Sequence, residues 1–305
     1  MDTRKLRYFL AIVEEGAFSR AAGRLNVAQP ALSLHVRRME EALGTPLLIR
    51  EPQGVRVTEA GDLLARRARA VLSELDRTEE ELKSFGREPS GTVRIGLPGT
   101  ISGILSVPLI AETRARYPRI KLIIAEAMSG FVRDWLHDGR VDLAVLYAEL
   151  REPGVRSEVL LREELVLLRP PGPTAAPLPP EALKDLPLIL PSNPHGLRKM
   201  IEADLPGMTL DPVIEVDSYA SIKKLVAAGY GCSVLPYHTV VDEVARGALQ
   251  ALPFAGPGLS RHACLAYASA RPLTGAAEAV SLLLKEVVAG LIRDETWAGA
   301  RQIDG

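Results

Sequence analysis

The 305-residue chain has few cysteines and no long apolar run. Its two cysteines, Cys232 and Cys264, are too few for a disulfide framework or a four-cysteine metal site, and they can form at most one bridge. No stretch reaches the roughly 18 apolar residues that a membrane-spanning helix needs, and the N-terminal segment has no apolar block of the kind found in signal peptides. We therefore expect a protein of the reducing cytoplasm with no membrane partner.

The sequence also lacks the common short motifs of catalysis and nucleotide binding. It contains no Gly-x-Ser-x-Gly elbow, no Gly-Lys-Ser/Thr phosphate loop, no Gly-x-Gly-x-x-Gly turn and no His-Glu-x-x-His zinc motif. Its five histidines are scattered along the chain. We expect no enzyme, and accordingly no catalytic residue, metal ligand or cofactor.

Neither sign of charge dominates the chain, but the charges are unevenly distributed. The formal net charge is -1, from 37 Lys and Arg against 38 Asp and Glu. Residues 1–70 contain twelve basic and eight acidic residues, a net charge of +4, so the remaining 235 residues carry -5. A mildly basic segment ahead of an acidic body suggests contact with nucleic acid at the N-terminal end.

The first 58 residues show three short helical patterns and a hairpin. Apolar residues recur at helical spacing in three runs, 6–13, 19–25 and 29–43. Two β-prone pieces follow, joined by Glu51-Pro52-Gln53-Gly54, a sequence typical of a hairpin turn. This order predicts a winged helix-turn-helix domain over 1–58, with the helix-turn-helix motif at about 18–37.

A long helical pattern follows at residues 59–86. Its apolar positions alternate in spacings of four and three residues, the signature of a coiled-coil seam: Leu64, Ala68, Val71, Leu75, Thr78, Leu82 and Phe85. Such a narrow stripe predicts a linker helix that pairs with a second copy of the chain. Packing of this helix on its own chain is the alternative. Residues 87–91 are expected to form a hinge.

Residues 92–293 alternate between strand and helix patterns. This alternation predicts a parallel sheet with covering helices, that is, an α/β domain. The strands fall into two clusters, which predicts lobe I at about 92–161 and 268–293 and lobe II at about 162–267. Residues 294–305 are expected to be a flexible tail.

Several motifs resemble those of the LysR-type transcriptional regulators. In the N-terminal part these are Ala21-Ala22, Leu-Asn-Val-Ala-Gln-Pro-Ala-Leu-Ser at 25–33, Leu43-Gly44, Pro-Leu-Leu-Ile-Arg at 46–50 and Thr-Glu-Ala-Gly at 58–61. In the body they are Gly-Thr-Val-Arg-Ile-Gly at 91–96, Asp-Leu-Ala-Val at 142–145 and Gly-Tyr-Gly at 229–231. Residues 97–100 and 144–147 further resemble the nitrogen assimilation control branch.

The resemblance implies a homo-oligomer that binds double-stranded promoter DNA. A homodimer would form through the linker helix, commonly assembling into a homotetramer, and a periplasmic-binding-protein-like body would bind a small-molecule effector. Contact with RNA polymerase is a further expectation. Two alternatives stay open: an effector-independent regulator whose body binds other proteins, and a small-molecule-binding, enzyme-like module with a DNA-binding appendage.

The helix that begins at Gln29 is the expected recognition helix, with its N-terminal residues in the major groove. Gln29 can hydrogen bond with adenine and Ser33 with a base or a phosphate, whereas phosphates are the expected partners further along the helix. The resemblance supports a base contact from His35, where the family often has glutamine. The predicted DNA-contacting residues are Gln29, Pro30, Ser33, His35, Arg37 and Arg38 on the helix, and Arg50 and Gln53 at the wing.

The expected effector site lies where strands of the body end and helices begin. Helix N-termini offer unpaired N–H groups to an anion there, so we expect an anionic small molecule. The predicted contacts are Gly99, Thr100, Ser102, Ser129 and Gly130 from one lobe and Asn193, Ser218 and Tyr219 from the other. Plain helix capping is the alternative for each serine. His195 and Arg198 would add positive charge or else face solvent.

Overall fold

The computed structural model describes residues 2–84, 86, 88–147, 153–173, 176–193, 195–205, 207–269 and 271–303. The chain divides into two compact units, one of Met1–Arg87 with His137–Arg140 and the other of Glu88–Leu136 with Val141–Gly305. Phe85, the last position of the expected seam, lies outside the described residues, as do Arg87 of the expected hinge and the last two residues of the chain.

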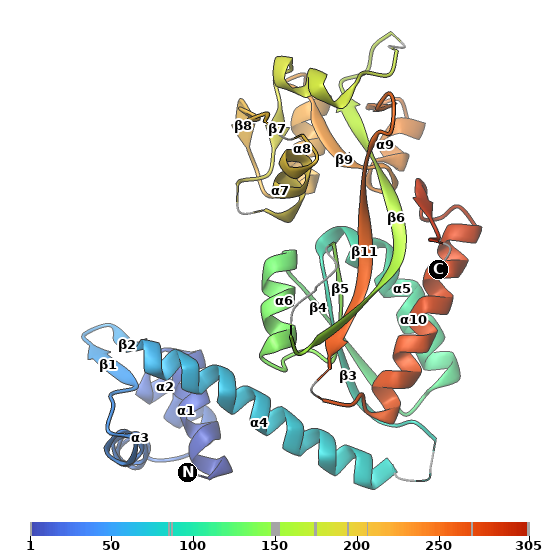
Figure 1. The fold of residues 1–305 in the computed structure, drawn as a ribbon. Helices are drawn as coiled ribbons and strands as arrows, with labels where there is room; N and C mark the ends of the chain where they lie inside the picture. The colour runs from blue at the N-terminus through green and yellow to red at the C-terminus, as the bar shows by residue number, and fades with distance from the viewer. Residues whose placement is uncertain are drawn as a thin grey trace. The chain divides into compact units, whose positions relative to one another are not determined.

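The N-terminal unit begins with three helices and a hairpin (Figure 1): α1 Thr3–Glu15, α2 Phe18–Leu25, α3 Gln29–Leu43, β1 Leu48–Glu51 and β2 Gly54–Val57. Each helix ends at a residue in the left-handed conformation, namely Gly16, Asn26 and Gly44. Glycine and asparagine adopt this conformation at the lowest cost, which explains where the helices stop. The hairpin is antiparallel, and the predicted winged helix-turn-helix is confirmed.

The three helices share one small core. Phe9, Ile12 and Leu32 are fully buried in it. Ala21 and Ala22 of α2 are buried beside them, and α2 contacts both α1 and α3. Small side chains at these two positions allow the helices to approach closely, because larger ones would overpack a dense interior.

The linker helix α4, Glu59–Ser84, presents two apolar stripes rather than one. Three side chains of its first half are buried against the winged-helix core: Ala65, Ala68 and Leu72. Four side chains of the expected seam are exposed: Val71, Leu75, Thr78 and Leu82. The assignment of Ala68 to an intermolecular seam is therefore wrong. The small side chain of Ala68 lets α4 pack closely against α1. This part of the α4 surface is therefore not available to a second copy of the chain.

The second unit is built on an eight-stranded mixed sheet with the order β10-β6-β11-β5-β3-β4, and β9 and β12 also pair with β6. Its strands are β3 Gly91–Leu97, β4 Ile120–Glu126, β5 Leu143–Leu146, β6 Val155–Arg169, β9 Ser233–Pro236, β10 Gln250–Pro253, β11 Leu259–Ala268 and β12 Ala300–Arg301. Among them, β4, β3 and β5 are parallel, whereas β6 and β11 run antiparallel to every neighbour. The predicted parallel arrangement is therefore correct for these three strands and wrong for the expected strands that form β6, β9 and β11.

Helices cover this sheet in both lobes: α5 Gly99–Arg116, α6 Ser129–His137, α7 Gly196–Ala203, α8 Tyr219–Ala227, α9 Val241–Ala245 and α10 Gly275–Arg293, with 3-10 turns at Pro180–Asp185 and Tyr237–Thr239. A second, two-stranded parallel sheet pairs β7 Ile189–Leu190 with β8 Ile214–Glu215. In lobe I, α5 and α10 pack side by side on one face of the strands, and α6 packs on the other (Figure 1).

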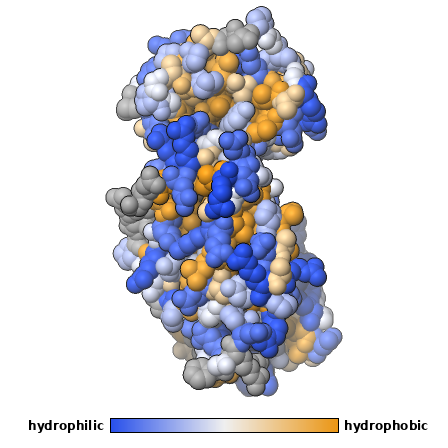
Figure 2. All heavy atoms as spheres, turned by 90° about the vertical axis from the view of Figure 1, so that its right-hand side faces the viewer, coloured by the Kyte–Doolittle hydropathy of each residue, from blue (hydrophilic) through white to orange (hydrophobic). Residues whose placement is uncertain are grey.

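The strands β6 and β11 run through both lobes (Figure 1). The core of lobe II contains Leu165 and Leu259, and the core of lobe I contains Leu161 and Ala263. The chain therefore returns to lobe I near Ala263, a few residues before the boundary predicted at 268. No described helix is both long and apolar enough to cross a membrane. Polar residues cover most of the face seen in Figure 2, and apolar residues form separate patches there.

The segment after α10 is not a frayed tail. Trp297 is 1% exposed and belongs to the lobe I core, and Ala300–Arg301 pair with β6. The expectation of a flexible tail over 294–305 is wrong for the described residues up to Ile303. It failed because one large aromatic side chain buries enough apolar surface to anchor the segment.

We predict that Trp297→Ala lowers the free energy of unfolding by about 3 to 5 kcal/mol, the usual cost of truncating a buried aromatic side chain. Urea denaturation followed by circular dichroism measures it. Ile303→Ala is the matched control, since Ile303 is 40% exposed. Equal stability of the two variants would contradict the anchoring role of Trp297.

Candidate functional site

Most predicted DNA-contacting side chains lie on the open face of α3 and at the hairpin. The exposed ones are Gln29, Pro30, Arg37, Arg38, Arg50 and Gln53, while Ser33 is partly exposed. Nε of Arg37 lies 2.9 Å from Oε1 of Glu41. Such an exposed pair contributes little free energy, so a phosphate can replace Glu41. The guanidinium carbon of Arg50 lies 4.7 Å above the Phe18 ring, which holds this arginine beside α2.

His35 is placed less openly than its neighbours on α3. Its ring meets the Tyr8 ring edge-on, with 5.3 Å between the ring centres. Its Nδ1 atom is buried and has no hydrogen-bond partner among the described residues. His35 therefore packs partly against α1, and Nε2 is the ring nitrogen left for a base contact.

In the second unit, a cavity of about 390 Å³ lies between the two lobes. Four of the eight predicted effector-site residues line it, namely Gly99, Ser129, Ser218 and Tyr219. They come from the N-termini of α5, α6 and α8. We call this space the interlobe cavity. The expectation that strand ends from both lobes converge on one space is met by the geometry of these four residues.

The other four predicted effector-site residues are placed differently. The Thr100 hydroxyl bonds to the Tyr147 hydroxyl, and Thr100 lines a neighbouring cavity of about 450 Å³. Ser102 bonds to Ser106 at 3.1 Å. Neither Ser102 nor Gly130 nor Asn193 is among the residues that line these two cavities. An α-helix turns by about 100° per residue, so residues further into a helix point away from the site at its N-terminus.

The predicted basic residues of lobe II also differ from expectation. Arg198 is buried, pairs with Glu202 at 2.5 Å and Glu215 at 3.1 Å, and donates to the Leu210 carbonyl. It therefore neither faces solvent nor adds charge to the interlobe cavity.

His195 does line the interlobe cavity. Its Nδ1 accepts the backbone N–H of Leu197 at 3.2 Å, and its ring lies edge-on to Tyr219. Burial lowers the pKa of the His195 imidazole, against the opposing effect of the nearby Asp217. Acceptance at Nδ1 and a lowered pKa both favour the neutral ring, so His195 adds no fixed positive charge.

Two serines stabilise local structure, Ser218 in the cavity lining and Ser192 beside the lining residue Asp217. The Ser218 hydroxyl accepts the Ser221 N–H and so caps α8. The Ser192 N–H and hydroxyl both donate to Oδ1 of Asp217, at 2.9 and 2.8 Å, and these bonds lower the pKa of Asp217. Ser218 therefore caps α8, as the alternative interpretation predicted, and it also lines the cavity.

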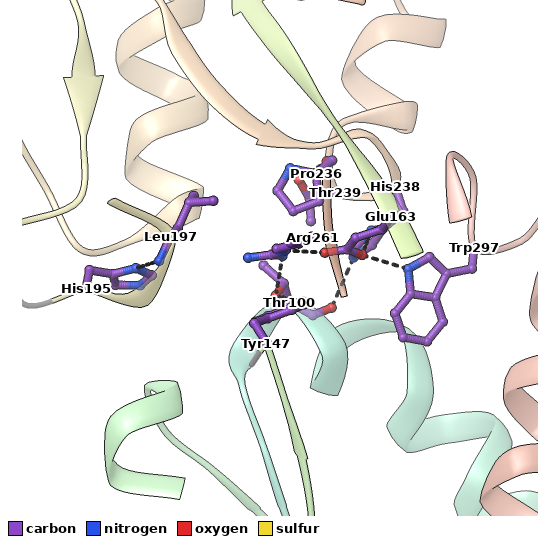
Figure 3. A network of polar contacts seen from close by, with 10 residues as sticks. All are labelled: Thr100, Tyr147, Glu163, His195, Leu197, Pro236, His238, Thr239, Arg261 and Trp297. Atoms are coloured by element: carbon purple, nitrogen blue, oxygen red, sulfur yellow. Dashed lines mark hydrogen bonds and ion pairs between the residues drawn. The ribbon is translucent and has the colours of Figure 1, made fainter. Parts of the chain in front are cut away.

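A buried polar network that the sequence did not predict reaches the interlobe cavity through Arg261 and Tyr147 (Figure 3). Glu163 of β6 and Arg261 of β11 face each other across the antiparallel ladder, 2.5 Å apart. The other Glu163 oxygen accepts the Trp297 indole N–H at 3.0 Å and lies 3.2 Å from Nδ1 of His238. The Arg261 guanidinium also stacks on the Tyr147 ring, 3.3 Å from its centre.

The network keeps both members of the pair ionised. Burial alone would raise the pKa of Glu163, but Arg261, His238 and Trp297 outweigh it and lower that pKa to about 2. Burial alone would lower the pKa of Arg261, and the facing Glu163 raises it above its usual value instead. The pair as a whole is neutral.

A signal for this pair was present in the sequence. Alternate residues of a strand point to the same face, so Leu161, Glu163 and Leu165 share one face of β6, and all three are buried. A single carboxylate inside an apolar series requires a buried partner. The partner lies 98 residues away, and only the strand pairing identifies it as Arg261.

We predict that Glu163→Gln lowers the free energy of unfolding by about 3 to 5 kcal/mol, because it leaves the buried Arg261 without its counter-charge. The double variant Glu163→Leu with Arg261→Met should recover much of this loss, since it removes both charges. Urea denaturation of the full chain measures both. A double variant no more stable than the single one would contradict the ion-pair explanation.

The same variant should also change the dependence of stability on pH. A carboxyl group whose pKa is lowered by folding stabilises the fold fully above its unfolded-state pKa and loses that contribution as the pH falls through its folded-state pKa. For Glu163 the loss should occur between about pH 4.5 and about pH 2. Denaturation midpoints across this range should fall more steeply for the wild type than for Glu163→Gln.

Comparisons with known proteins agree with this architecture. A model of the LysR substrate binding domain matches residues 86–289, and a model of the bacterial regulatory helix-turn-helix proteins of the lysR family matches residues 3–62. The nitrogen assimilation regulatory protein nac of Escherichia coli is 34% identical over 239 residues, which cover 77% of this chain and 78% of that protein.

Other relatives extend over nearly the whole chain. A hydrogen peroxide-inducible genes activator of Haemophilus influenzae is 30% identical over 95% of this chain and 100% of its own length. A solved full-length OxyR variant from Pseudomonas aeruginosa is 27% identical, with a TM-score of 0.75 over 100% of this chain and 99% of that one. Full-length BenM is 25% identical, with a TM-score of 0.57 over 98% of this chain and 99% of that one. The two matching models together cover most of the chain, which therefore belongs to the LysR family of DNA-binding transcription regulators.

Proposed function

We propose that this regulator binds specific promoter DNA as a dimer or tetramer and changes its activity when a small molecule enters the interlobe cavity. The observation that carries the DNA-binding part is the open face of α3, where Gln29, Ser33 and Arg37 are accessible on a helix fixed by a buried opposite face. A rigid helix with polar side chains near its N-terminus fits the major groove. We further propose that the protein acts in the cytoplasm and that it contacts RNA polymerase at the promoter.

Dimerisation is supported by the exposed stripe of α4. Val71 and Leu75 are 49% and 43% exposed, and Leu82 is 71% exposed. Apolar side chains repeated along one face of a helix are stabilised by a second helix. A net charge of +4 over residues 1–70 is small for a DNA-binding domain, and linking two such domains raises the affinity through effective concentration.

The effector part of the proposal is supported by the interlobe cavity, which receives residues from both lobes. A ligand that contacts both lobes binds one arrangement of them better than another and so shifts their equilibrium. The alternative, a body that serves only as a protein-binding platform, provides no reason for a polar space between the lobes. A DNA footprint that no small molecule changes would favour that alternative.

The relatives' names suggest two physiological roles. The match to the nitrogen assimilation regulatory protein supports the nitrogen assimilation control branch. A response to hydrogen peroxide through a cysteine is not supported, because Cys232 and Cys264 are both buried. Burial raises the pKa of the Cys232 thiol, and the thiolate is the form that peroxide oxidises.

We predict that Ser33→Ala and Arg37→Ala each weaken DNA binding by about 1 to 3 kcal/mol, the usual cost of losing a base or phosphate contact. The DNA is the duplex that the full-length protein enriches from a random library, and gel shifts at one fixed salt concentration measure affinity. Arg114→Ala, an exposed arginine of the second unit, is the control. Unchanged affinity in both α3 variants would rule out α3 as the recognition helix.

We predict that Val71→Glu with Leu75→Glu converts the dimer into a monomer, because four like charges would face one another in the seam. Sedimentation velocity measures the mass, and DNA affinity should fall by about a hundredfold or more through the lost bivalency. Glu74→Lys changes an exposed residue of the same turn outside the stripe and should stay dimeric. A wild-type protein that sediments as a monomer would refute this interface.

A further inference from the structure

The charges around the interlobe cavity do not fit the anionic effector expected from the sequence. One arginine, Arg261, lines the cavity, and its side chain is only 2% exposed. Its charge is already matched by Glu163, at 2.5 Å. A ligand carboxylate placed on Arg261 would be a second buried anion sharing one cation, and like charges repel strongly where water is excluded.

The helix N-terminus that was expected to hold an anion is already faced by a carboxylate of the protein. Oε1 of Glu126, at the end of β4, lies 3.1 Å from the position that a Cβ atom on Gly99 would occupy. Gly99 is the first residue of α5. The positive end of the α5 dipole thus faces Glu126, and an anionic ligand would have to displace it or approach it closely.

The remaining charged groups of the cavity are also acidic. Asp217 of lobe II lines the cavity opposite the lobe I residues, and only one of its oxygens is used by Ser192. His195 is favoured in its neutral form by the bond that its Nδ1 accepts. Counting Glu126, Asp217 and the Glu163–Arg261 pair, the cavity carries an excess of negative charge, which attracts cations and repels anions.

Arg261 nevertheless offers hydrogen-bond donors to a ligand. In Figure 3 its guanidinium points away from the indole of Trp297 and toward the side on which His195 lies. Its Nε donates to Glu163 and its Nη2 to the Thr100 hydroxyl at 3.5 Å, so Nη1 is the nitrogen whose N–H groups can meet a neutral acceptor such as a carbonyl oxygen. Tyr219, whose ring lies edge-on to that of His195, also lines the cavity and adds a hydroxyl and an aromatic face.

We propose that the interlobe cavity binds a small molecule without net negative charge, and this inference rests on the proposed effector site. The ligand places a neutral carbonyl-type acceptor on Arg261 and a protonated amine beside Glu126 and Asp217. Glu126 belongs to lobe I and Asp217 to lobe II, and both line the cavity, so the amine contacts an acidic side chain of each lobe. Its binding therefore favours the arrangement in which the lobes are close.

Four rod-shaped probes of almost equal size test the charge pattern: 4-(aminomethyl)benzamide, 4-(aminomethyl)benzoate, 4-methylbenzamide and 4-methylbenzoate. They carry a cation, both charges, no charge and an anion, respectively. Isothermal titration of the full-length protein at fixed ionic strength measures each affinity. We expect the aminomethyl benzamide to bind about tenfold or more tightly than the methylbenzoate, in keeping with one favourable and one unfavourable charge contact.

Variants test whether the preference for 4-(aminomethyl)benzamide over 4-methylbenzoate depends on Glu126 and Asp217. In Glu126→Gln with Asp217→Asn, the tenfold preference should disappear, whereas Glu181→Gln, an exposed carboxylate that does not line the cavity, should keep it. Asn at 217 retains an oxygen for Ser192, and equal thermal unfolding midpoints establish that the variants fold.

Three results would overturn the proposal. Tighter binding of methylbenzoate would establish an anionic effector while leaving the effector site intact. An unchanged preference in the double variant would place the binding elsewhere. Binding of none of the four probes would refute the charge pattern, and gel shifts on the same preparations would report separately whether the protein still functions as a DNA-binding regulator.

Discussion

One buried ion pair, formed by Glu163 and Arg261 on the two strands that run through both lobes, links distant segments of the second unit. Removing two charges from water costs free energy, and this cost is offset only when further groups satisfy them. Here the groups come from distant segments, including Trp297 after α10 and Tyr147 after β5. The pair thus explains both why the C-terminal segment is anchored and why the polar network at the cavity is uncharged overall.

Local features of the fold were predictable from the sequence because their causes are local. Apolar residues at helical spacing, with Gly16 and Gly44 after the first and third runs, determine the helices of the DNA-binding domain. The strand-to-helix junctions at Gly99 and Ser129 likewise follow from composition along the chain. Four of the predicted effector-site residues line the cavity for this reason, since a helix that follows a parallel strand begins at the same sheet edge.

Features that depend on long-range pairing were not predictable from a single sequence. The antiparallel partnership of β6 and β11 joins residues about a hundred positions apart, and without it Arg261 cannot be assigned to Glu163. The division of α4 into two stripes has a similar origin, because Ala68 could face either α1 or a second copy until the helix was packed. A stripe of residues indicates that a partner exists, and the packing alone indicates which partner it is.

The two stripes of α4 have a mechanical consequence. Ala65, Ala68 and Leu72 pack the first half of the helix against the DNA-binding domain. The domain and this half of α4 therefore form one packed unit. In the proposed dimer, in which two copies join through Val71, Leu75 and Leu82, the angle between the paired α4 helices would set the separation of the two α3 helices. In that proposed dimer, the linker would select the spacing of half-sites on DNA independently of how tightly each α3 binds its own half-site.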